Sequence, residues 1–508
     1  MPDSIARGFG RLLPWLVAAL SLAVGLAIVR PFTAVPVSFD TQATVAYFDR
    51  LVGGVRLEQA LSTTPKPFLT LVEGTAHWLT GGWHLIVWLT MLAQAACAGL
   101  AVVLAGRAAG LAAGAAAGLV VAGMPVLIED AAFGNAVPWA LLGWLLAGLL
   151  LSGTRPRPGL AGIVLLLAAL SRLETLVIVA VIGGAIAWAR VGPWPLPGPR
   201  PTAPPRAWLA VAIPFAALPA MLAHDWLLTG DPLFWVKVSQ RYSDAFRRVG
   251  NILDPVERIM WFIRRYAHLW PAVALAIVGL AALVRRRQWG PLVGLGAMGP
   301  GIAAFIVLLA VRGLYAPDRY ALPVDLALFL LAAVGFGQVV ELAVERLGPA
   351  AMARRLIVGG AFAVVLSGVA LTGSGPFDPG VNRTIADFRI LSENTAHVES
   401  VLRSRTAGGS TAGPIGWIVP TAVRPRMAVD LGVPLTAIAG LSPAWADASN
   451  ALLEAGQIVF HDRQGDRPRG GYGVLETGGE VSIGALTLRP LLIDETRGIW
   501  LYEVIAGP

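Results

Sequence analysis

Residues 85–105 read LIVWLTMLAQAACAGLAVVLA, and residues 109–128 read AGLAAGAAAGLVVAGMPVLI. Each stretch is about as long as a helix that crosses a hydrocarbon core of roughly 30 Å. One such pair is compatible with a buried core, but a repeated series predicts a polytopic α-helical membrane protein with about eleven transmembrane helices. We place the spans at 11–29, 85–105, 109–128, 136–152, 159–171, 174–189, 207–227, 268–284, 290–311, 321–340 and 356–373.

The composition agrees with a membrane protein. Of the 508 residues, 56% are hydrophobic and 14% are charged, with a mean hydropathy of +0.68, whereas soluble domains carry roughly 25% charged residues. The net charge of +8 predicts membrane lipids and an anionic substrate as partners, and no nucleic acid. Cys97 is the only cysteine, which excludes disulfides and cysteine-ligated zinc. The histidines are scattered, so we expect no histidine-built metal site.

Polar segments divide the chain. The stretches 30–84 and 228–267 interrupt the spans, and we expect outward amphipathic loop helices there. After about residue 374 the pattern changes to a helix-like segment followed by short β-like runs punctuated by glycine and proline, at 384–403, 416–420, 457–460 and 499–505. We therefore predict a transmembrane module at 1–375 and a small α/β domain at 376–508.

Arginines in the short connections predict the orientation. If the N-terminus is cytoplasmic, most of the arginines in the short connections lie on the inner side of the membrane. They include residues 285–287, which directly follow a span. The two long polar stretches are basic as well, so a count over all loops is a tie, and we give weight to the short flanks. The first span has no cleavage pattern after it and is interpreted as an uncleaved anchor. These features predict a multi-pass protein of the inner or plasma membrane, with its C-terminal domain extracytoplasmic.

Asp40 follows the first span at the start of an amphipathic stretch. A carboxylate at a membrane–water boundary can act as a general base toward an incoming hydroxyl. The alternative is an N-cap, in which Asp40 satisfies free backbone N–H groups. Lys66, in the sequence Pro65-Lys66-Pro67, either pairs with a phosphate or extends to the lipid headgroups.

Further carboxylates and an arginine lie at the ends of later spans. Glu129 and Asp130 could orient an acceptor or bind a divalent cation, or they could be ordinary helix-end residues. Arg172 and Glu174 are flanked by apolar sequence, where unpaired charges are costly. They either line a cavity or form a structural ion pair.

Three cations lie in segments expected on the outer side, namely Lys237, Arg241 and Arg319. Lysine and arginine hold phosphate oxygens through charge-assisted hydrogen bonds. The alternative is that a basic interfacial helix binds anionic lipids.

The order of these segments resembles the GT-C superfamily of polyprenyl-phosphate-sugar-dependent glycosyltransferases. This group contains protein O-mannosyltransferases, aminoarabinose transferases and RgtA/B/C/D-type enzymes. The matching segments extend from residue 1 to about 375, and Leu173 stands where many members have a proline. They are Asp40 after the first span, Pro65-Lys66-Pro67-Phe68-Leu69, Leu170-Ser171-Arg172-Leu173-Glu174, Leu228-Thr229-Gly230-Asp231-Pro232-Leu233 with Lys237, and Asp318-Arg319-Tyr320-Ala321-Leu322-Pro323.

The resemblance implies an inverting hexosyl or pentosyl transferase that acts on the extracytoplasmic face. Asp40 would deprotonate an acceptor hydroxyl on a glycan, lipid or protein, and a polyprenyl-phosphate-linked sugar would be the donor. Lys237, Arg241, Arg319 and Arg172 would hold the donor phosphate, a leaving group that needs cationic stabilisation. The sequence leaves undecided whether a divalent cation binds near Glu129 and Asp130 as a cofactor.

Two other functions are compatible with the same spans. A lipid or polysaccharide transporter or flippase would share the intramembrane charges, but usually has internal repeats with paired broken helices, and the segment 30–84 has no second copy. A membrane-anchored assembly protein would use its C-terminal domain, and loss of the Asp40 or Lys237 side chain would then be harmless.

Overall fold

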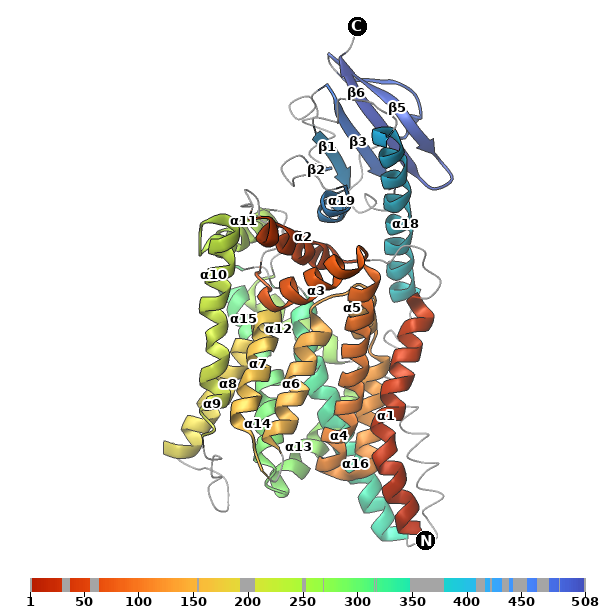
Figure 1. The fold of residues 1–508 in the computed structure, drawn as a ribbon. Coiled ribbons are helices and arrows are strands. Elements are labelled where there is room, and N and C mark those ends of the chain that lie inside the picture. Colours follow the sequence, from red (N-terminus) through yellow and green to blue (C-terminus); the bar gives the residue numbers. More distant parts are fainter. Residues whose placement is uncertain are drawn as a thin grey trace.

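The structure is a computed structural model with a helical bundle and a six-stranded sheet at one end of it (Figure 1). The predicted span at 356–373 and the predicted boundary after residue 375 lie outside the described residues. The structure describes residues 2–29, 37–54, 64–152, 155–191, 206–248, 253–267, 269–314, 316, 318–347, 379–407, 416–420, 423–431, 438–441, 455–463, 475–483 and 485–506.

The apolar stretches form the helices of the bundle, and each helix overlaps a predicted span. These helices are α1 (Pro2–Val29), α4 (His84–Gly123), α6 (Val137–Leu151), α7 (Pro158–Ser171), α8 (Glu174–Val191), α9 (Leu209–Ala212) continued by α10 (Ala217–Thr229), α13 (Trp270–Arg285), α14 (Trp289–Gly296) continued by α15 (Ile302–Val311), and α16 (Leu322–Leu347).

The number of spans depends on how bent helices are counted. Four of the described helices are long and apolar enough to cross a membrane, namely α4, α9 with α10, α14 with α15, and α16. The number rises to six if each of two bent pairs is one span, and α7 is a shorter apolar helix. The described residues thus support a multi-pass membrane protein, but the predicted number of about eleven is not confirmed by this measure.

Helix α4 is a hairpin. Ala109 (φ −147°) and Gly110 (φ 85°) leave the helical conformation in its middle, and Gln94 Nε2 donates to Val121 O at 2.8 Å. In one straight helix these two residues, 27 positions apart, would be separated by roughly 40 Å. The two predicted spans are therefore two antiparallel arms, and the turn uses the positive φ that glycine tolerates.

Helices from the two polar stretches cover one end of the bundle (Figure 1). The first stretch forms α2 (Phe39–Gly53) and α3 (Pro67–Thr80), and the second forms α11 (Phe234–Arg248) and α12 (Pro255–Ala267). We call this the α2/α3 end. The N-terminus lies at the opposite end of the bundle (Figure 1).

The C-terminal residues form a mixed sheet with the strand order β2-β1-β3-β6-β5-β4. Strand β1 pairs in parallel with β2 and β3, and the other neighbours are antiparallel. The helix and the strand segments predicted for this region are confirmed. The elements are α18 (Pro379–Ala407), β1 (Gly416–Pro420), α19 (Arg424–Leu431), β2 (Ile438–Leu441), β3 (Gln457–Asp462), β4 (Val481–Ile483), β5 (Leu486–Asp494) and β6 (Ile499–Ala506).

The sheet region is attached to the α2/α3 end. Tyr47 of α2 and Met427 of α19 belong to one buried apolar cluster. Beside it, Trp83 Nε1 donates to both carboxylate oxygens of Asp430 at 3.3 Å. Parts of α2 and α3 therefore lie between the membrane helices and the C-terminal region.

Glycines let α13 and α16 pack backbone to backbone. A Cβ added at Gly335 would lie 1.9 Å from Leu275 O, and one at Gly279 would lie 2.1 Å from Leu331 O. Small residues allow such close approach in membrane helices. We expect Gly335→Leu to destabilise the bundle by at least about 1–3 kcal/mol, because overpacking separates the helices. Thermal unfolding in detergent measures this, with Gly184→Leu as the control, since no atom lies within 4 Å of a Cβ there. Equal stability of both variants would contradict the predicted close packing.

Candidate active site

Asp40 lies in the first turn of α2, one of the helices that cover the bundle. Ser38 caps this helix: its Oγ accepts from Thr41 N at 3.2 Å. The same hydroxyl donates to Asn135 Oδ1 at 2.5 Å, and Thr41 Oγ1 donates to Gly134 O at 2.9 Å. The capping role considered for Asp40 is therefore wrong, because the helix begins one residue earlier. The start of α2 is held against the turn before α6.

Asp40 forms an ion pair with a lysine that directly precedes α3. Lys66 Nζ lies 3.1 Å from Asp40 Oδ2, and only 10% of the Lys66 side chain is exposed, against 26% for Asp40. Lys66 immediately precedes α3, and Pro67 is the first residue of that helix, a position that suits proline. The pair therefore depends on the packing of α2 against α3.

Glu73 is a third ionisable residue here that the sequence analysis missed. It lies on α3 about two turns after Lys66, it is buried, and Thr44 donates to its Oε2. Burial raises the pKa of Glu73 to about 8, against the opposing effects of the Thr44 hydrogen bond and the Lys66 charge. At neutral pH Glu73 is therefore mostly protonated and adds little negative charge beside Asp40. An acid on the same face of α3 as Lys66 was the signal available in the sequence.

Asp130 is part of the same end of the bundle. Asn135 Nδ2 donates to Asp130 Oδ1 at 2.6 Å, and Asn135 accepts from Ser38. This chain of hydrogen bonds connects Asp130 to the start of the helix that carries Asp40. Glu129 is the preceding residue, on α5 (Pro125–Ala132).

Arg172 lies between α7 and α8 at this end. It donates to Glu174 Oε1 from Nη2 at 2.5 Å and from Nε at 3.2 Å, and both side chains are about nine-tenths buried. Its guanidinium carbon lies 5.8 Å from the centre of the Tyr320 ring. Tyr320 belongs to the short helix Asp318–Ala321, which also contains Arg319, whose side chain lies outside the description.

Lys237 is on the outer helix α11 and is 58% exposed. Its Nζ lies 2.5 Å from Asp231 Oδ2. The described contacts do not join Lys237 to Asp40, Lys66 or Arg172. The Arg241 side chain, on the same helix, lies outside the description.

The end of α10 contacts both the covering helices and the start of α11. His224 contacts the Tyr47 ring, with the ring centres 5.7 Å apart, and lies 3.3 Å from Thr70 Oγ1. Next to it, Asp225 Oδ2 accepts from Trp235 N at 2.8 Å. The helix that carries Lys237 is therefore positioned at the α2/α3 end.

Two further arginines lie on α12, which forms the basic end of the second polar stretch. Arg258 and Arg265 each place a guanidinium carbon 5.1 Å from the centre of the Trp261 ring. Arg265 also binds both oxygens of Asp325, at 2.6 and 3.2 Å, and Arg258 donates to Ala316 O at 2.9 Å. These contacts connect α12 to the segment that precedes Arg319 and to α16.

The sequence did not decide whether the protein binds a divalent cation. Among the described residues, no group of three or more histidine, cysteine, aspartate or glutamate side chains is arranged to hold a metal ion. The α2/α3 end holds a carboxylate beside a buried lysine, and the Arg172–Glu174 pair lies at the same end. Such a site can accept a proton and stabilise an anionic leaving group.

No family model matches the chain, and no curated protein matches it in sequence. Among solved structures, ArnT from Cupriavidus metallidurans in the apo state aligns with a TM-score of 0.54 at 13% identity, covering 97% of this chain and 98% of that chain. ArnT bound to undecaprenyl phosphate gives 0.54 at 14% identity with the same coverage. The Archaeoglobus fulgidus oligosaccharyltransferase tethered with an acceptor peptide gives 0.49 at 13% identity, covering 84% of this chain and 64% of that chain.

The chain therefore has the fold of ArnT, an aminoarabinose transferase of the GT-C superfamily. The similarity extends over nearly the whole length of both chains, including the C-terminal region. The predicted resemblance is confirmed at the level of the fold.

Proposed function

We propose that this protein is a membrane glycosyltransferase that moves a hexose or pentose from a polyprenyl-phosphate carrier to an acceptor hydroxyl. The observation that carries the proposal is the Asp40–Lys66 pair at the covered end of a bundle with the ArnT fold. The carrier is assigned by analogy with ArnT, which has been solved with undecaprenyl phosphate bound. The acceptor is a glycan, a lipid or a protein.

The reaction we propose is a single inverting displacement. Asp40 accepts the proton of the acceptor hydroxyl, whose oxygen forms a bond to the anomeric carbon as the bond from that carbon to the phosphate oxygen breaks. The leaving polyprenyl phosphate takes the electron pair of the broken bond. Lys66 neutralises the charge that develops on this phosphate.

Other cations complete the proposed phosphate site. Lys237, Arg241, Arg319 and Arg172 stay candidate donor contacts, and Arg265, oriented by Asp325, joins them. Glu129 and Asp130 are proposed to orient the acceptor, or to support a divalent cation. Glu174 is proposed to hold the guanidinium of Arg172 in place.

The proposed activity is tested with purified full-length protein and labelled polyprenyl-phosphate sugars. We expect release of free polyprenyl phosphate, together with label in an acceptor from a membrane extract. Movement of intact donor lipid across a vesicle membrane, with no cleavage of the sugar–phosphate bond, would contradict the proposal and favour a flippase.

The orientation is part of the proposal. We propose a cytoplasmic N-terminus and extracytoplasmic residues 376–508, because many arginines lie at the end opposite Asp40. A phosphatase reporter fused after Pro508 is expected to be active only in the periplasm or cell exterior, since alkaline phosphatase activity requires export. An inactive reporter in a fusion protein that is stably produced would reverse the topology. The arginines concerned are Arg107, Arg155, Arg157, Arg190, Arg206, Arg285, Arg286 and Arg287.

Glu73 predicts a pH dependence of the proposed reaction. Because its pKa is about 8, Glu73 is neutral below that pH and ionised above it. Ionisation adds a negative charge beside Asp40 and the donor phosphate, so we expect wild-type turnover to fall as the pH rises through about 8. Glu73→Gln should remove this alkaline decline and keep neutral-pH turnover within a few-fold. An unchanged pH profile would contradict this role.

The same substitution has a consequence for stability. An acid with a raised pKa in the folded state binds more protons when folded, so its stabilising contribution is lost as the pH rises from its ordinary value near 4.5 to about 8. The melting temperature of the wild type should therefore fall over this pH range, relative to that of the Glu73→Gln variant. This readout is independent of activity.

A further inference from the structure

A cavity of about 570 Å³ lies inside the bundle at the end opposite Asp40. Its lining includes Ser152, which follows α6, and Ala189, near the end of α8. The other ends of these two helices, at Val137 and Glu174, lie at the α2/α3 end. The volume is within the range of sites for small ligands, roughly 300–1,000 Å³.

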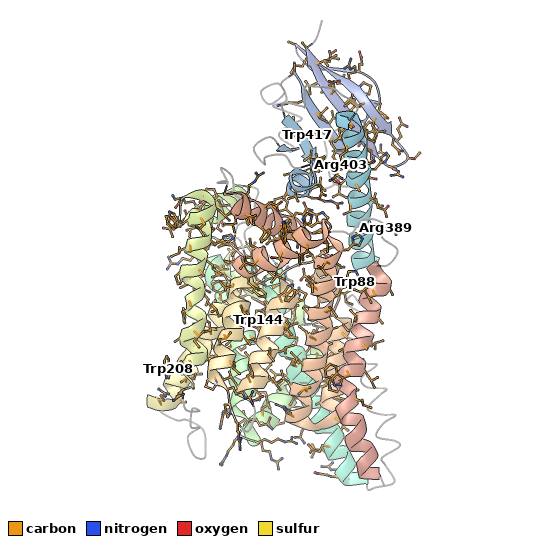
Figure 2. All side chains as sticks on the ribbon, viewed as in Figure 1. Trp88, Trp144, Trp208, Arg389, Arg403 and Trp417 are labelled. Carbon is orange, nitrogen blue, oxygen red and sulfur yellow. The ribbon has the colours of Figure 1, made fainter. Side chains whose placement is uncertain are left out.

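The walls are apolar and the mouth is cationic. Trp144, Leu165 and other aliphatic side chains line the interior, and Arg107 and Arg287 contribute to the same cavity. Trp144 lies within the bundle (Figure 2). Among the described residues, neither arginine has an ion pair or a side-chain hydrogen bond. The neighbouring Arg286, by contrast, is paired with Glu341.

The backbone at Arg287 is unusual. Its φ is 55°, directly after the end of α13, where glycine is the common residue. A non-glycine residue in this conformation is strained, and such strain persists where the side chain has a use. Here the conformation places an arginine in the cavity lining, one residue beyond the paired Arg286.

Gln288 supplies a polar group beside the two arginines. Its Nε2 lies 3.4 Å from Ala108 O, and its Oε1 is buried with no hydrogen-bond partner in the described structure. A buried acceptor without a donor is costly. The mouth therefore presents two cations and one acceptor to a ligand whose remainder is apolar.

We propose that this cavity binds an anionic phospholipid, with one acyl chain inside the bundle and the phosphate between Arg107 and Arg287. Arginine binds phosphate oxygens through paired charge-assisted hydrogen bonds, and basic pockets between membrane helices suit anionic headgroups. A headgroup hydroxyl, as in phosphatidylglycerol, donates to Gln288 Oε1. The proposal is independent of the transferase activity, because a phosphate held here is at the end of the bundle remote from Asp40.

Lipid binding to delipidated full-length protein tests the charge requirement. We titrate phosphatidylglycerol and phosphatidylcholine with identical acyl chains and follow binding by native mass spectrometry. The anionic lipid is expected to bind about tenfold more tightly, and the double variant Arg107→Gln/Arg287→Gln should lose this preference. Arg285→Gln is the matched control, since Arg285 is exposed at the same end but does not line the cavity. Equal binding of both lipids by the wild type, or an unchanged preference in the double variant, overturns the proposal.

A second variant tests the apolar part without touching the arginines. Gly148 lines the cavity, and a Cβ there meets only Leu104, at 3.7 Å. Gly148→Leu should fill the space and weaken phosphatidylglycerol binding about tenfold, whereas Gly184→Leu, outside the lining, should not. Undiminished phosphatidylglycerol binding in Gly148→Leu overturns the proposal. It is also overturned if the wild type binds undecaprenyl phosphate more tightly than phosphatidylglycerol and Gly148→Leu abolishes that binding. Loss of lipid binding with normal sugar transfer separates this site from the proposed active site.

Discussion

Asp40→Asn is expected to lower sugar transfer about a hundredfold or more, because it removes the proton acceptor of the proposed displacement. The fold should be kept, since Ser38 rather than Asp40 caps α2. The amide can still accept a hydrogen bond from Lys66, although the ion pair is lost. The assay follows sugar release from a polyprenyl-phosphate donor, with thermal stability measured alongside.

Two control variants on the same segment separate chemistry from structure. Asp49→Asn changes an acid near the other end of α2 and should keep turnover. Ser38→Ala removes the helix cap and should cost about 1 kcal/mol of stability, while the base is retained. Full activity in a stable Asp40→Asn protein would remove Asp40 from the mechanism, and Glu129 or Asp130 would become the next candidate base.

Lys66→Met is expected to lower turnover roughly 10- to 150-fold, since a hydrogen bond to a charged group contributes about 1.5–3 kcal/mol. Methionine keeps the apolar stem of a largely buried side chain and removes the ammonium group with its charge and donors. The loss should appear in kcat, because the phosphate gains charge as the bond to the sugar breaks. Donor binding and turnover are measured separately to test this.

Lys237→Met and Arg319→Gln are the comparison variants. Lys237 is 58% exposed and paired with Asp231, and exposed pairs of this kind contribute about 0–1 kcal/mol. We therefore expect a smaller loss for Lys237→Met than for Lys66→Met. The reverse order would place the donor phosphate on α11, as the sequence analysis predicted, and a normal Lys66→Met enzyme would leave Lys66 only a structural partner of Asp40.

Several residues of the candidate site could be found from the sequence because charges are rare in its apolar segments. Asp130, Arg172 and Glu174 stood out in this way, and the structure places them at the same end as Asp40. Glu73 was missed because it lies in a polar stretch, where an acid is unremarkable. Only the packing of α2 over α3 buries it beside Thr44.

The fold was predictable to a similar extent. The two arms of α4 and the strand segments of the C-terminal region follow from local apolar patterns. The number of spans stays a prediction, because its count depends on bent pairs such as α5 and α6, which meet at a 118° bend. Such bends depend on what packs around the break.

The sequence by itself determined that this is a multi-pass helical membrane protein with a mixed α/β C-terminal region, and it indicated the GT-C resemblance. These properties depend on the length, period and order of segments, which are local features of the chain. Only the tertiary structure decided that Ser38 caps α2, that Lys66 rather than a solvated cation pairs with Asp40, and that Arg107 and Arg287 share a cavity. The physical reason is that burial and ion pairing depend on which distant segment packs against a residue. The spacing of residues along the chain does not specify that segment.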